Sequence, residues 1–349
     1  MCVCMFLIFR HGSHSSIVLS NRQSIVQIEP FLVISFYRKR IAQKKILYVI
    51  DCVYVVLFVS NQGIDNLTIV FQEEEKPVKI HFLGTAAAEG FPNPFCRCEA
   101  CCKARSLGGK NIRTRSSILI DNLIKVDYSA DSHMQALRDR IDLGAIEHLL
   151  FTHTHYDHFQ PSDLYNRIEG FAHGIDHPLH IYGNDVAISQ TVTALGPDAG
   201  GRFAFHLLRP FDTISLGNTR VTPLLANHDP METCLLFYIE KGGKTLFYGN
   251  DTGWLNDDTW KWLQGKRIDM AILDCTHSYT NNKRNPNHMG IESVLEVQRV
   301  WREEGTIGRD GLIYVTHFTH NSNFLHDDFE RAFEPAGIKV AYDGLIVDL

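Results

Sequence analysis

The sequence predicts a mixed α/β domain in which two packed β-sheets are covered by outer helices. Between Val78 and Leu349 many apolar, strand-like runs follow one another, and only some of them are separated by a helical stretch. This order departs from a strict βαβ alternation, so two sheets fit the sequence better than one parallel sheet. The chain has 349 residues, of which 44% are hydrophobic and 21% charged, and this globular composition suits one large or two ordinary domains.

The predicted elements begin with a strand at 78–84, "VKIHFLG", which ends in glycine. The runs "SSILID" and "LIKVD" predict a hairpin that turns at Asp121 and Asn122. The segment "SADSHMQALRDR" begins with good N-cap residues and predicts a helix, and "IEHLLFTH" predicts the next strand. Further strands are expected in "HIYG", "TRVTPLLAN", "CLLFYIE", "KTLFYGN", "DMAILDC", "LIYVTH" and "LIVDL", and further helices at about 184–195, 256–264, 290–303 and 324–334.

Residues 1–77 differ from the rest of the chain. They contain a single alanine, Ala42, and the run "ILYVIDCVYVVLFV" at 46–59 is apolar apart from Asp51. A membrane-spanning helix needs about 20 apolar residues, so this run is short, and the N-terminus lacks the basic leader and cleavage site of a signal peptide. Three interpretations stay open: a β-rich or membrane-associated addition, a poorly ordered extension, or sequence upstream of the natural start, which we favour. The charged stretch "QEEEKP" marks the expected boundary with a domain at 78–349.

Charge and cysteine content bound the class of protein. The formal net charge of −6 argues against a broad electrostatic surface for nucleic acid. Four of the nine cysteines lie in "CRCEACC" at 96–102. In a long chain without a clear secretion signal, closely spaced thiols more often hold a metal ion than form disulfides, so we expect a reducing, cytoplasmic compartment.

The densest group of histidines is "FTHTHYDHF" at 151–159, directly after an apolar strand. In an extended loop, residues two apart point the same way, so His153 and His155 are placed to bind one metal ion. Asp157 and His158 are neighbours whose side chains are expected to diverge, which places them to address a second ion. Neutral imidazole and carboxylate suit zinc, manganese or iron, and two adjacent ions can share a bridging oxygen.

Three later strands end in groups that could complete two such sites. "LLANHD" supplies His228, "LFYGNDTG" supplies Asp251, and "IYVTHFTH" supplies His317. Each of them alone would be an ordinary polar residue at a strand end. Together with the histidine motif they form a pattern that is specific for one superfamily.

The pattern resembles the metallo-β-lactamase-fold hydrolases over about 78–349. The resemblance implies an α+β fold, a metallo-β-lactamase-like four-layer αββα sandwich with its metal site at the edge of the sheets. It also implies two ligand sets that share one bridging carboxylate: His153, His155 and His228 for one ion, Asp157, His158 and His317 for the other, and Asp251 for both.

A narrower resemblance comes from "GTAAAEGFPNPFCRCEAC" after the first strand, combined with "THFTH" near the end. These motifs resemble the branch that contains the cyclic phosphodiesterase of the carbon–phosphorus lyase pathway, which hydrolyses a phosphoribosyl cyclic phosphate. That branch holds a separate structural zinc, whose ligands correspond here to Cys96, Cys98, Cys101 and His320. Three thiolates and one imidazole make a closed tetrahedral zinc site, which would tie the first loop to the last strands.

The segments "DCTHSY" and "NPNHMG" resemble the same branch, in which the histidine of the second motif is catalytic. This histidine corresponds to His288, whose loop position suits a side chain that reaches into a site. The alternative is a histidine near a helix N-terminus with a local role. Asp127, which follows "LIKV", is expected to be structural rather than catalytic.

The expected activity is hydrolysis of a small, cyclic phosphodiester with two divalent ions, Zn or Mn, that activate the attacking water. His288, protonated, is expected to donate to the leaving alkoxide or to stabilise the charge of the transition state, and Asp157 is expected to hold the second ion and thereby to be essential for catalysis. The resemblance implies no nucleic-acid partner and no membrane, and a homodimer is compatible with the branch.

Four alternatives share parts of this pattern. A tRNA 3′-processing nuclease has the metal motif, but its substrate-gripping insertion and basic character are not clear in this sequence. A glyoxalase-type thioesterase has the motif without the cysteine triplet. The pyrroloquinoline quinone biosynthesis B protein has a similar opening but a degraded histidine motif, whereas this one is intact. The non-enzymatic alternative is a metal-dependent scaffold without turnover.

Overall fold

The computed structural model describes Val53–Tyr54, Gln72–Glu73 and residues 77–349 except residue 281. The contacts divide the chain into two units, Met1–Lys76 and Pro77–Leu349. In the first unit, β1 (Val53–Tyr54) pairs antiparallel with β2 (Gln72–Glu73). The interpretations of residues 1–77 as an extension or as non-native sequence fall almost entirely outside the described residues and stay predictions. Among the residues that the structure describes, none of the helices combines the length and the apolar character that crossing a bilayer requires.

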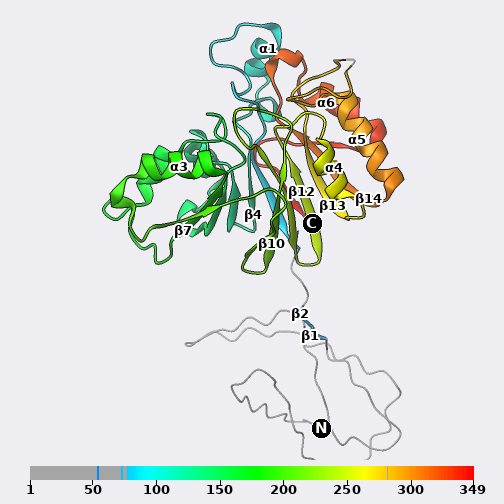
Figure 1. Cartoon of the computed structure of the whole chain (residues 1–349). Helices are drawn as coiled ribbons and strands as arrows, with labels where there is room; N and C mark the ends of the chain where they lie inside the picture. The colour runs from blue at the N-terminus through cyan, green and yellow to red at the C-terminus, as the bar shows by residue number, and fades with distance from the viewer. Residues whose placement is uncertain (1–52, 55–71, 74–76, 281) are drawn as a thin grey trace, which may run out of the picture. The chain divides into compact units, whose positions relative to one another are not determined.

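Residues 77–349 contain two seven-stranded sheets that pack face to face (Figure 1). The first sheet comprises, in spatial order, β16 (Ile346–Asp348), β3 (Lys79–Gly84), β4 (Ser117–Ile120), β5 (Ile124–Val126), β6 (His148–Leu150), β7 (Leu179–Gly183) and β8 (Phe203–Leu207). The second comprises β15 (Lys339–Val340), β14 (Ile307–Thr316), β13 (Ile268–Asp274), β12 (Lys244–Gly249), β11 (Leu235–Lys241), β10 (Thr219–Leu225) and β9 (Ile214–Leu216). Each sheet is antiparallel on one side and parallel on the other, and the parallel strands begin at β5 in the first sheet and at β12 in the second.

Helices cover the outer faces of both sheets. Figure 1 shows α3 beside β7 on one side of the sandwich and α4, α5 and α6 beside the second sheet on the other. The α-helices are α1 (Glu99–Leu107), α2 (Ser132–Asp139), α3 (Asp185–Leu195), α4 (Asp257–Leu263), α5 (Ile291–Glu304) and α6 (His326–Phe333). Short 3₁₀ helices connect them: η1 (Gly109–Asn111), η2 (Leu143–Ala145), η3 (Pro161–Arg167), η4 (Pro197–Ala199), η5 (His320–Ser322) and η6 (Glu334–Ala336).

The alternation of side chains along the strands explains the layers. In β5, Ile124 and Val126 point into the apolar core between the sheets, where they join Phe237 and Tyr248 of the second sheet. Side chains on the opposite faces form two further cores, one beneath α4–α6 and one around α3 and η3. Successive residues of a strand face opposite sides, so a sheet buried on both faces needs apolar residues at nearly every position. The expected four-layer αββα sandwich is therefore confirmed.

Most predicted elements are present within a residue or two of their expected ends. The predicted hairpin turns at Asp121 and Asn122, whose φ angles of 50° and 60° are left-handed, and Leu123 N donates to the Ile120 carbonyl at 2.9 Å across the turn. Helix α1 and the strands β8, β9 and β15 were not predicted from the sequence. Helix α1 begins inside the cysteine motif, and the Cys98 thiol caps it by accepting the Cys101 backbone N–H. Cysteine is a poor local signal for a helix start, which is why this element was missed.

Candidate metal centre and active site

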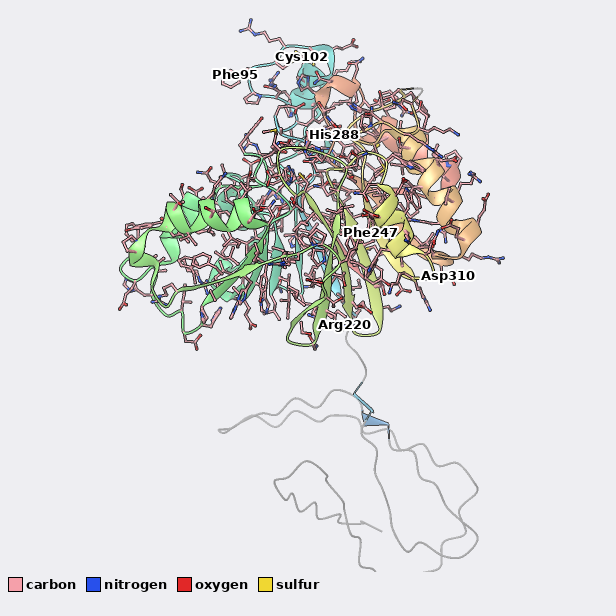
Figure 2. The ribbon with its side chains drawn as sticks, viewed as in Figure 1. Phe95, Cys102, Arg220, Phe247, His288 and Asp310 are labelled. Carbon is pink, nitrogen blue, oxygen red and sulfur yellow. The ribbon has the colours of Figure 1, made fainter. Side chains whose placement is uncertain are left out.

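The seven predicted active-site ligands lie in loops that follow strands at one edge of the sandwich. His153, His155, Asp157 and His158 follow β6, His228 follows β10, Asp251 follows β12 and His317 follows β14. Figure 2 labels His288 at this edge, whereas Arg220, near the start of β10, lies at the opposite end of the sandwich. The ligand atoms gather in two groups within 4.8 Å, His153, His155, His228 and Asp251 in one and Asp157, His158, Asp251 and His317 in the other.

Asp251 lies at the centre of this cluster and belongs to both groups. Its Oδ2 atom lies 3.3 Å from His153 Nε2, 3.0 Å from His158 Nε2 and 3.5 Å from His317 Nε2. A carboxylate that faces imidazoles from both groups has the position expected of a bridging ligand. The grouping is the one that the sequence analysis expected.

Two histidines are oriented through Asp127, a buried residue that follows β5. His158 Nδ1 donates to Asp127 Oδ2 at 2.7 Å. His153 Nδ1 lies 2.9 Å from the Thr152 hydroxyl, which itself donates to Asp127 at 2.9 Å and therefore accepts from the imidazole. In both rings the proton is held on Nδ1, so the Nε2 lone pair points into the cluster.

Two further histidines are held in the same manner by other groups. His155 Nε2 donates to Asp229 Oδ2 at 2.9 Å, which directs its Nδ1 lone pair into the cluster, where Nδ1 lies 3.1 Å from His228 Nε2. His317 Nδ1 lies 2.7 Å from the Thr276 hydroxyl, which donates to Asp274 at 3.2 Å. Sequence reasoning missed the orienting roles of Asp127, Asp229 and Asp274. The available signal was weak: Asp127 follows a strand, Asp274 ends one, and Asp229 directly follows a predicted ligand.

The inward-facing atoms fit divalent cations. Within the described part of the chain, His153 Nε2, His158 Nε2, His317 Nε2 and Asp251 Oδ1 are buried without a hydrogen-bond partner. Buried polar atoms are rarely left unpaired, and a site for a metal ion is one of the standard reasons when they are. Neutral imidazoles and carboxylates are the ligands that zinc, manganese and iron share, so the residues present suit two such ions.

The electrostatics of the cluster favour positive charge at its centre. Burial opposes a charge on His158, but the Asp157 and Asp127 carboxylates outweigh it and raise the pKa of His158 well above its ordinary value. Burial likewise opposes the charge of Asp251, yet the charge of His317 and the proximity of the other imidazoles lower the pKa of Asp251 well below its usual range. The negative charge of the carboxylates would hold protons on these imidazoles. A bound metal ion would replace those protons.

Three residues of the cluster have left-handed backbones. Asp127, Asp251 and His317 have φ angles of 60°, 55° and 66° and each follows a strand closely. Such conformations cost about 1–3 kcal/mol each outside glycine and persist where the surrounding structure imposes them. At these positions the sharp turn directs the side chain back over the sheet edge, into the cluster.

One expectation about this loop is wrong. Asp157 and His158 do not diverge, because Asp157 Oδ2 and His158 Nε2 lie 3.1 Å apart. The chain is not extended at this point: His158 N and Phe159 N both donate to the His155 carbonyl at 2.9 Å, which forms a turn. The turn brings the two neighbours to the same side.

His288 lies beside the two groups in the loop before α5. Its Nδ1 atom lies 3.0 Å from Asp274 Oδ2 and 3.1 Å from Asp251 Oδ1, and its side chain is 24% exposed. Burial opposes protonation, but Asp274 and Asp251 outweigh it and raise the pKa of His288 to about 11. Asp274 also accepts the backbone N–H groups of Thr276 at 2.9 Å and Met289 at 3.1 Å, so its lone pairs are largely used and it anchors His288.

Gly253 allows the loops that carry Asp251 and His288 to pack closely. A Cβ atom at this position would lie 1.9 Å from the Pro286 carbonyl oxygen. The backbone of the same loop is held by a hydrogen bond from Trp254 N to the Asn285 carbonyl at 2.8 Å. Glycine is therefore required for His288 to reach the cluster.

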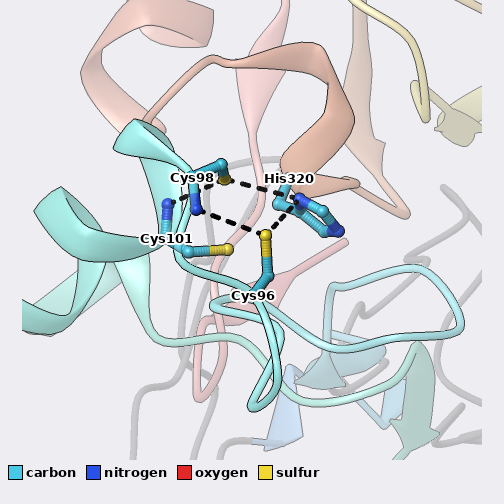
Figure 3. Close-up of side chains that lie close together, drawn as sticks. All are labelled: Cys96, Cys98, Cys101 and His320. Atoms are coloured by element: carbon cyan, nitrogen blue, oxygen red, sulfur yellow. Dashed lines mark hydrogen bonds between the residues drawn. The ribbon is translucent and has the colours of Figure 1, made fainter.

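The four predicted structural-zinc ligands also come together (Figure 3). Cys96 Sγ and Cys98 Sγ lie 3.7 Å and 3.6 Å from His320 Nδ1, and all four ligand atoms lie within 4.8 Å of one another. A tetrahedral ion with Zn–S bonds of about 2.3 Å separates its ligand atoms by about 3.6–3.8 Å, so the spacing fits zinc. Figure 3 shows the thiols of the first loop facing His320 of η5, which joins segments more than 200 residues apart.

The thiols differ in their readiness to ionise. The Cys101 backbone N–H lowers the pKa of Cys98 to about 6, whereas burial raises the pKa of Cys101 to about 12. Because zinc binds thiolates, one ligand is available at neutral pH and the other would release its proton when the ion binds.

Comparisons with known proteins agree with this architecture. The chain is 24% identical over 189 residues to the probable metallo-hydrolase YhfI of Bacillus subtilis, which covers 53% of this chain and 70% of that protein. Among solved structures, a diphosphatase from the PhnP family is 21% identical with a TM-score of 0.62, over 78% of this chain and 98% of the other. Zinc-bound PqqB from Methylobacterium extorquens is 22% identical with a TM-score of 0.61, over 78% of this chain and all of the other. At these identities the structural likeness establishes the fold.

The family is established by a separate comparison. A family model described as the beta-lactamase superfamily domain matches residues 117–309, which is more than half of the 349-residue chain. The matched region begins at β4 and ends in β14, and it contains six of the seven predicted active-site ligands together with His288. The chain therefore belongs to the beta-lactamase superfamily and is a metal-dependent hydrolase with the metallo-β-lactamase fold.

Proposed function

We propose that the chain is a phosphodiesterase that hydrolyses a small, cyclic phosphodiester. The observation that carries the proposal is the arrangement of His288 beside two complete ligand sets that share Asp251. Two divalent ions bound there would supply an activated water nucleophile and would stabilise negative charge on the phosphoryl oxygens. The ligands proposed for them are His153, His155 and His228 in one set, Asp157, His158 and His317 in the other, and Asp251 in both.

His288 is proposed as the proton donor to the leaving alkoxide. Asp274 accepts from its Nδ1 atom, which fixes the ring and leaves Nε2 as the second site for a proton. Its side chain is partly exposed, unlike the buried His158 and His317, so it can reach a substrate. A general acid must lie within hydrogen-bonding reach of the atom that it protonates, and a loop position beside the cluster supports this role.

Asp157 is proposed to be essential because it completes the second ligand set. Its Oδ2 atom lies 3.1 Å from His158 Nε2 and 3.6 Å from His317 Nε2. Burial opposes its ionisation, but His158 and His317 keep the pKa of Asp157 far below its usual range. The group is therefore an anion at every pH at which an enzyme of this kind would act.

The cysteine cluster is proposed to bind one structural zinc ion through Cys96, Cys98, Cys101 and His320. Its closed set of four ligands, which leaves no position for a substrate or water, supports a structural role. The cluster also supports the narrower choice of a phosphodiesterase over a thioesterase, because it belongs to the resemblance from which that choice came.

The test is turnover of a substrate panel by the full chain with Mn or Zn added. The panel contains phosphoribosyl 1,2-cyclic phosphate, a 2′,3′-cyclic nucleotide, bis-p-nitrophenyl phosphate and a glutathione thioester. We expect cleavage of a cyclic phosphate by the unmodified protein and by Asp258→Ala, which removes an exposed acid in the first turn of α4. Asp157→Ala should lose both the activity and about one equivalent of active-site metal.

Two outcomes would overturn the proposal. If Asp157→Ala kept both metal equivalents and full turnover, the ligand assignment would be wrong. If the fully metal-loaded protein cleaved only the thioester, or nothing in the panel, the chain would be a hydrolase of another class.

A further inference from the structure

One cavity in the described part of the chain lies away from the metal cluster. It has a volume of about 690 Å³ and borders the outer face of the first sheet at β5, β6 and β7, beside η2 and η3. None of the proposed metal ligands lines it. Cavities of about 300–1,000 Å³ are typical of small-molecule sites, so its size alone is compatible with a ligand.

The walls of this cavity, which we call the outer cavity, are largely aliphatic. Six aliphatic residues line it: Leu143, Ile146, Leu149, Leu164, Ile175 and Leu179. Four of them, Ile146, Leu149, Leu164 and Leu179, are buried members of the core around α3. Such walls favour a ligand with an apolar body.

Lys125 introduces a buried amine into the outer cavity. It lies in the middle of β5, on the face opposite Val126, and is only 1% exposed. Its Nζ atom donates to the Ser117 hydroxyl, and the Tyr128 ring lies 5.6 Å away. An ammonium has three donors, so one hydrogen bond among the described residues leaves it under-satisfied. Burial accordingly lowers the pKa of Lys125 to about 7, even though the Asp127 charge favours the protonated form.

Arg167, the last residue of η3, is the second buried cation at the outer cavity. It is 8% exposed, and its two Nη atoms donate to the carbonyls of Gly144 at 3.2 Å and His177 at 3.1 Å. Its Nε atom is buried and has no hydrogen-bond partner among the residues that the structure describes. Backbone carbonyls thus hold two of the five N–H groups of the guanidinium, while the buried Nε–H is left to donate to an anion.

We propose that the outer cavity binds a small carboxylate with an apolar body, such as a medium-chain fatty acid or an aryl carboxylate. The carboxylate would accept from Lys125 Nζ and Arg167 Nε, and the apolar body would lie against the aliphatic walls. The bound anion would offset the cost of burying two cations that have no carboxylate partner of their own among the described side chains.

Two acidic residues of the outer cavity restrict the charge of the ligand. Asp142 and Asp163 line it as well, and Asp142 Oδ1 accepts the Gly144 backbone N–H at 2.8 Å. Two cations against two carboxylates leave little excess positive charge for a dianion. The outer cavity should therefore prefer a monocarboxylate to an alkyl phosphate of the same chain length.

The test is calorimetric titration of the full, metal-loaded chain with octanoate, octanol, octylamine and octyl phosphate. We expect octanoate to bind at least about tenfold more tightly than the other three, because only octanoate gains charge-assisted hydrogen bonds from both cations without repulsion. Lys125→Met and Arg167→Gln should each weaken octanoate binding by about tenfold or more. Arg220→Gln is the control, because Arg220 of β10 is an exposed cation that does not line the outer cavity, and its loss should leave the affinity unchanged.

Two further variants separate the outer cavity from the metal centre and from misfolding. Asp157→Ala should bind octanoate with unchanged affinity, because no metal ligand lines the outer cavity. Ala172→Phe should abolish binding by filling space without removing a charge. The proposal would be overturned if octanoate did not bind, or if octanol and octanoate bound with equal affinity. It would also be overturned if Lys125→Met and Ala172→Phe both bound octanoate as tightly as the unmodified protein, or if Asp157→Ala lost octanoate binding.

Discussion

Asp127 provides the sharpest test of how the metal cluster is built. The substitution Asp127→Asn keeps the shape of the side chain and removes its charge. It acts on orienting contacts and removes no ligand, because Asp127 is not among the proposed ligands. We expect the ion held by Asp157, His158 and His317 to bind more weakly, while the protein stays folded.

The magnitude follows from the hydrogen bonds that Asp127 accepts. His158 Nδ1 donates to it at 2.7 Å, the Thr152 backbone N–H at 2.8 Å and the Thr152 hydroxyl at 2.9 Å. A hydrogen bond to a charged group contributes about 1.5–3 kcal/mol, and removal of a partner that orients a metal-binding histidine typically lowers metal affinity about 10–100-fold. We expect the metal affinity to fall by a factor in this range. The fall should lie near the lower end of the range if the asparagine oxygen still accepts from His158.

The assay is metal content after dialysis against graded concentrations of a chelator, followed by turnover at rising metal concentration. Asp127→Asn should release about one equivalent at a chelator concentration that the unmodified protein withstands, and excess metal should restore turnover. The matched control is Asp269→Asn, which removes a carboxylate that accepts the Thr245 backbone N–H at 2.9 Å near the far end of β13. It should leave metal affinity unchanged. Unaltered metal affinity in Asp127→Asn would refute the orienting role, and simultaneous loss of the cysteine-bound ion would indicate unfolding instead.

The remaining predictions concern four separate positions. His288→Ala should lower kcat about 10²–10⁴-fold with full metal content, measured by steady-state kinetics and metal analysis, because it removes only a proton donor. Gly253→Ala should lower kcat at least about tenfold and retain the metal, because its Cβ would meet a backbone carbonyl at 1.9 Å and the His288 loop must move. Cys101→Ser should lose one zinc equivalent and lower Tm by several degrees, whereas the active-site ions remain. Burial holds the pKa of Lys125 near 7 in the folded chain, against 10.5 in the unfolded chain. The buried amine therefore destabilises the fold fully below pH 7, and this destabilisation fades as the pH rises toward 10.5. Lys125→Met should therefore raise the free energy of unfolding at pH 6 more than at pH 9, and an equal gain at both, measured by urea denaturation, would contradict the burial of a titrating amine.

Local patterns in the sequence were sufficient for the layers of the fold and for the candidate ligands. Strands such as β12 and β13 are apolar at nearly every position because both faces of their sheet are covered, and that pattern is visible without coordinates. The residue types that bind metals are few, so three histidines and an aspartate directly after a strand already limit the chemistry. Element ends and helix α1 were less accessible, because the Cys98 cap depends on the geometry of its own loop.

The tertiary structure decided which groups orient the ligands and where a second ligand could bind. Asp127 and Asp229 look like ordinary polar residues in the sequence, and only the packing of loops from different strands places them against His158 and His155. The turn that brings Asp157 and His158 together is likewise set by hydrogen bonds to the His155 carbonyl rather than by alternation along the chain. Lys125 lies in a strand whose sequence pattern predicts a buried, apolar segment. Its neighbours across the outer cavity belong to segments about 20 to 50 residues later in the chain. A sequence pattern determines what a side chain can do, whereas its partners depend on long-range packing, which no local pattern encodes.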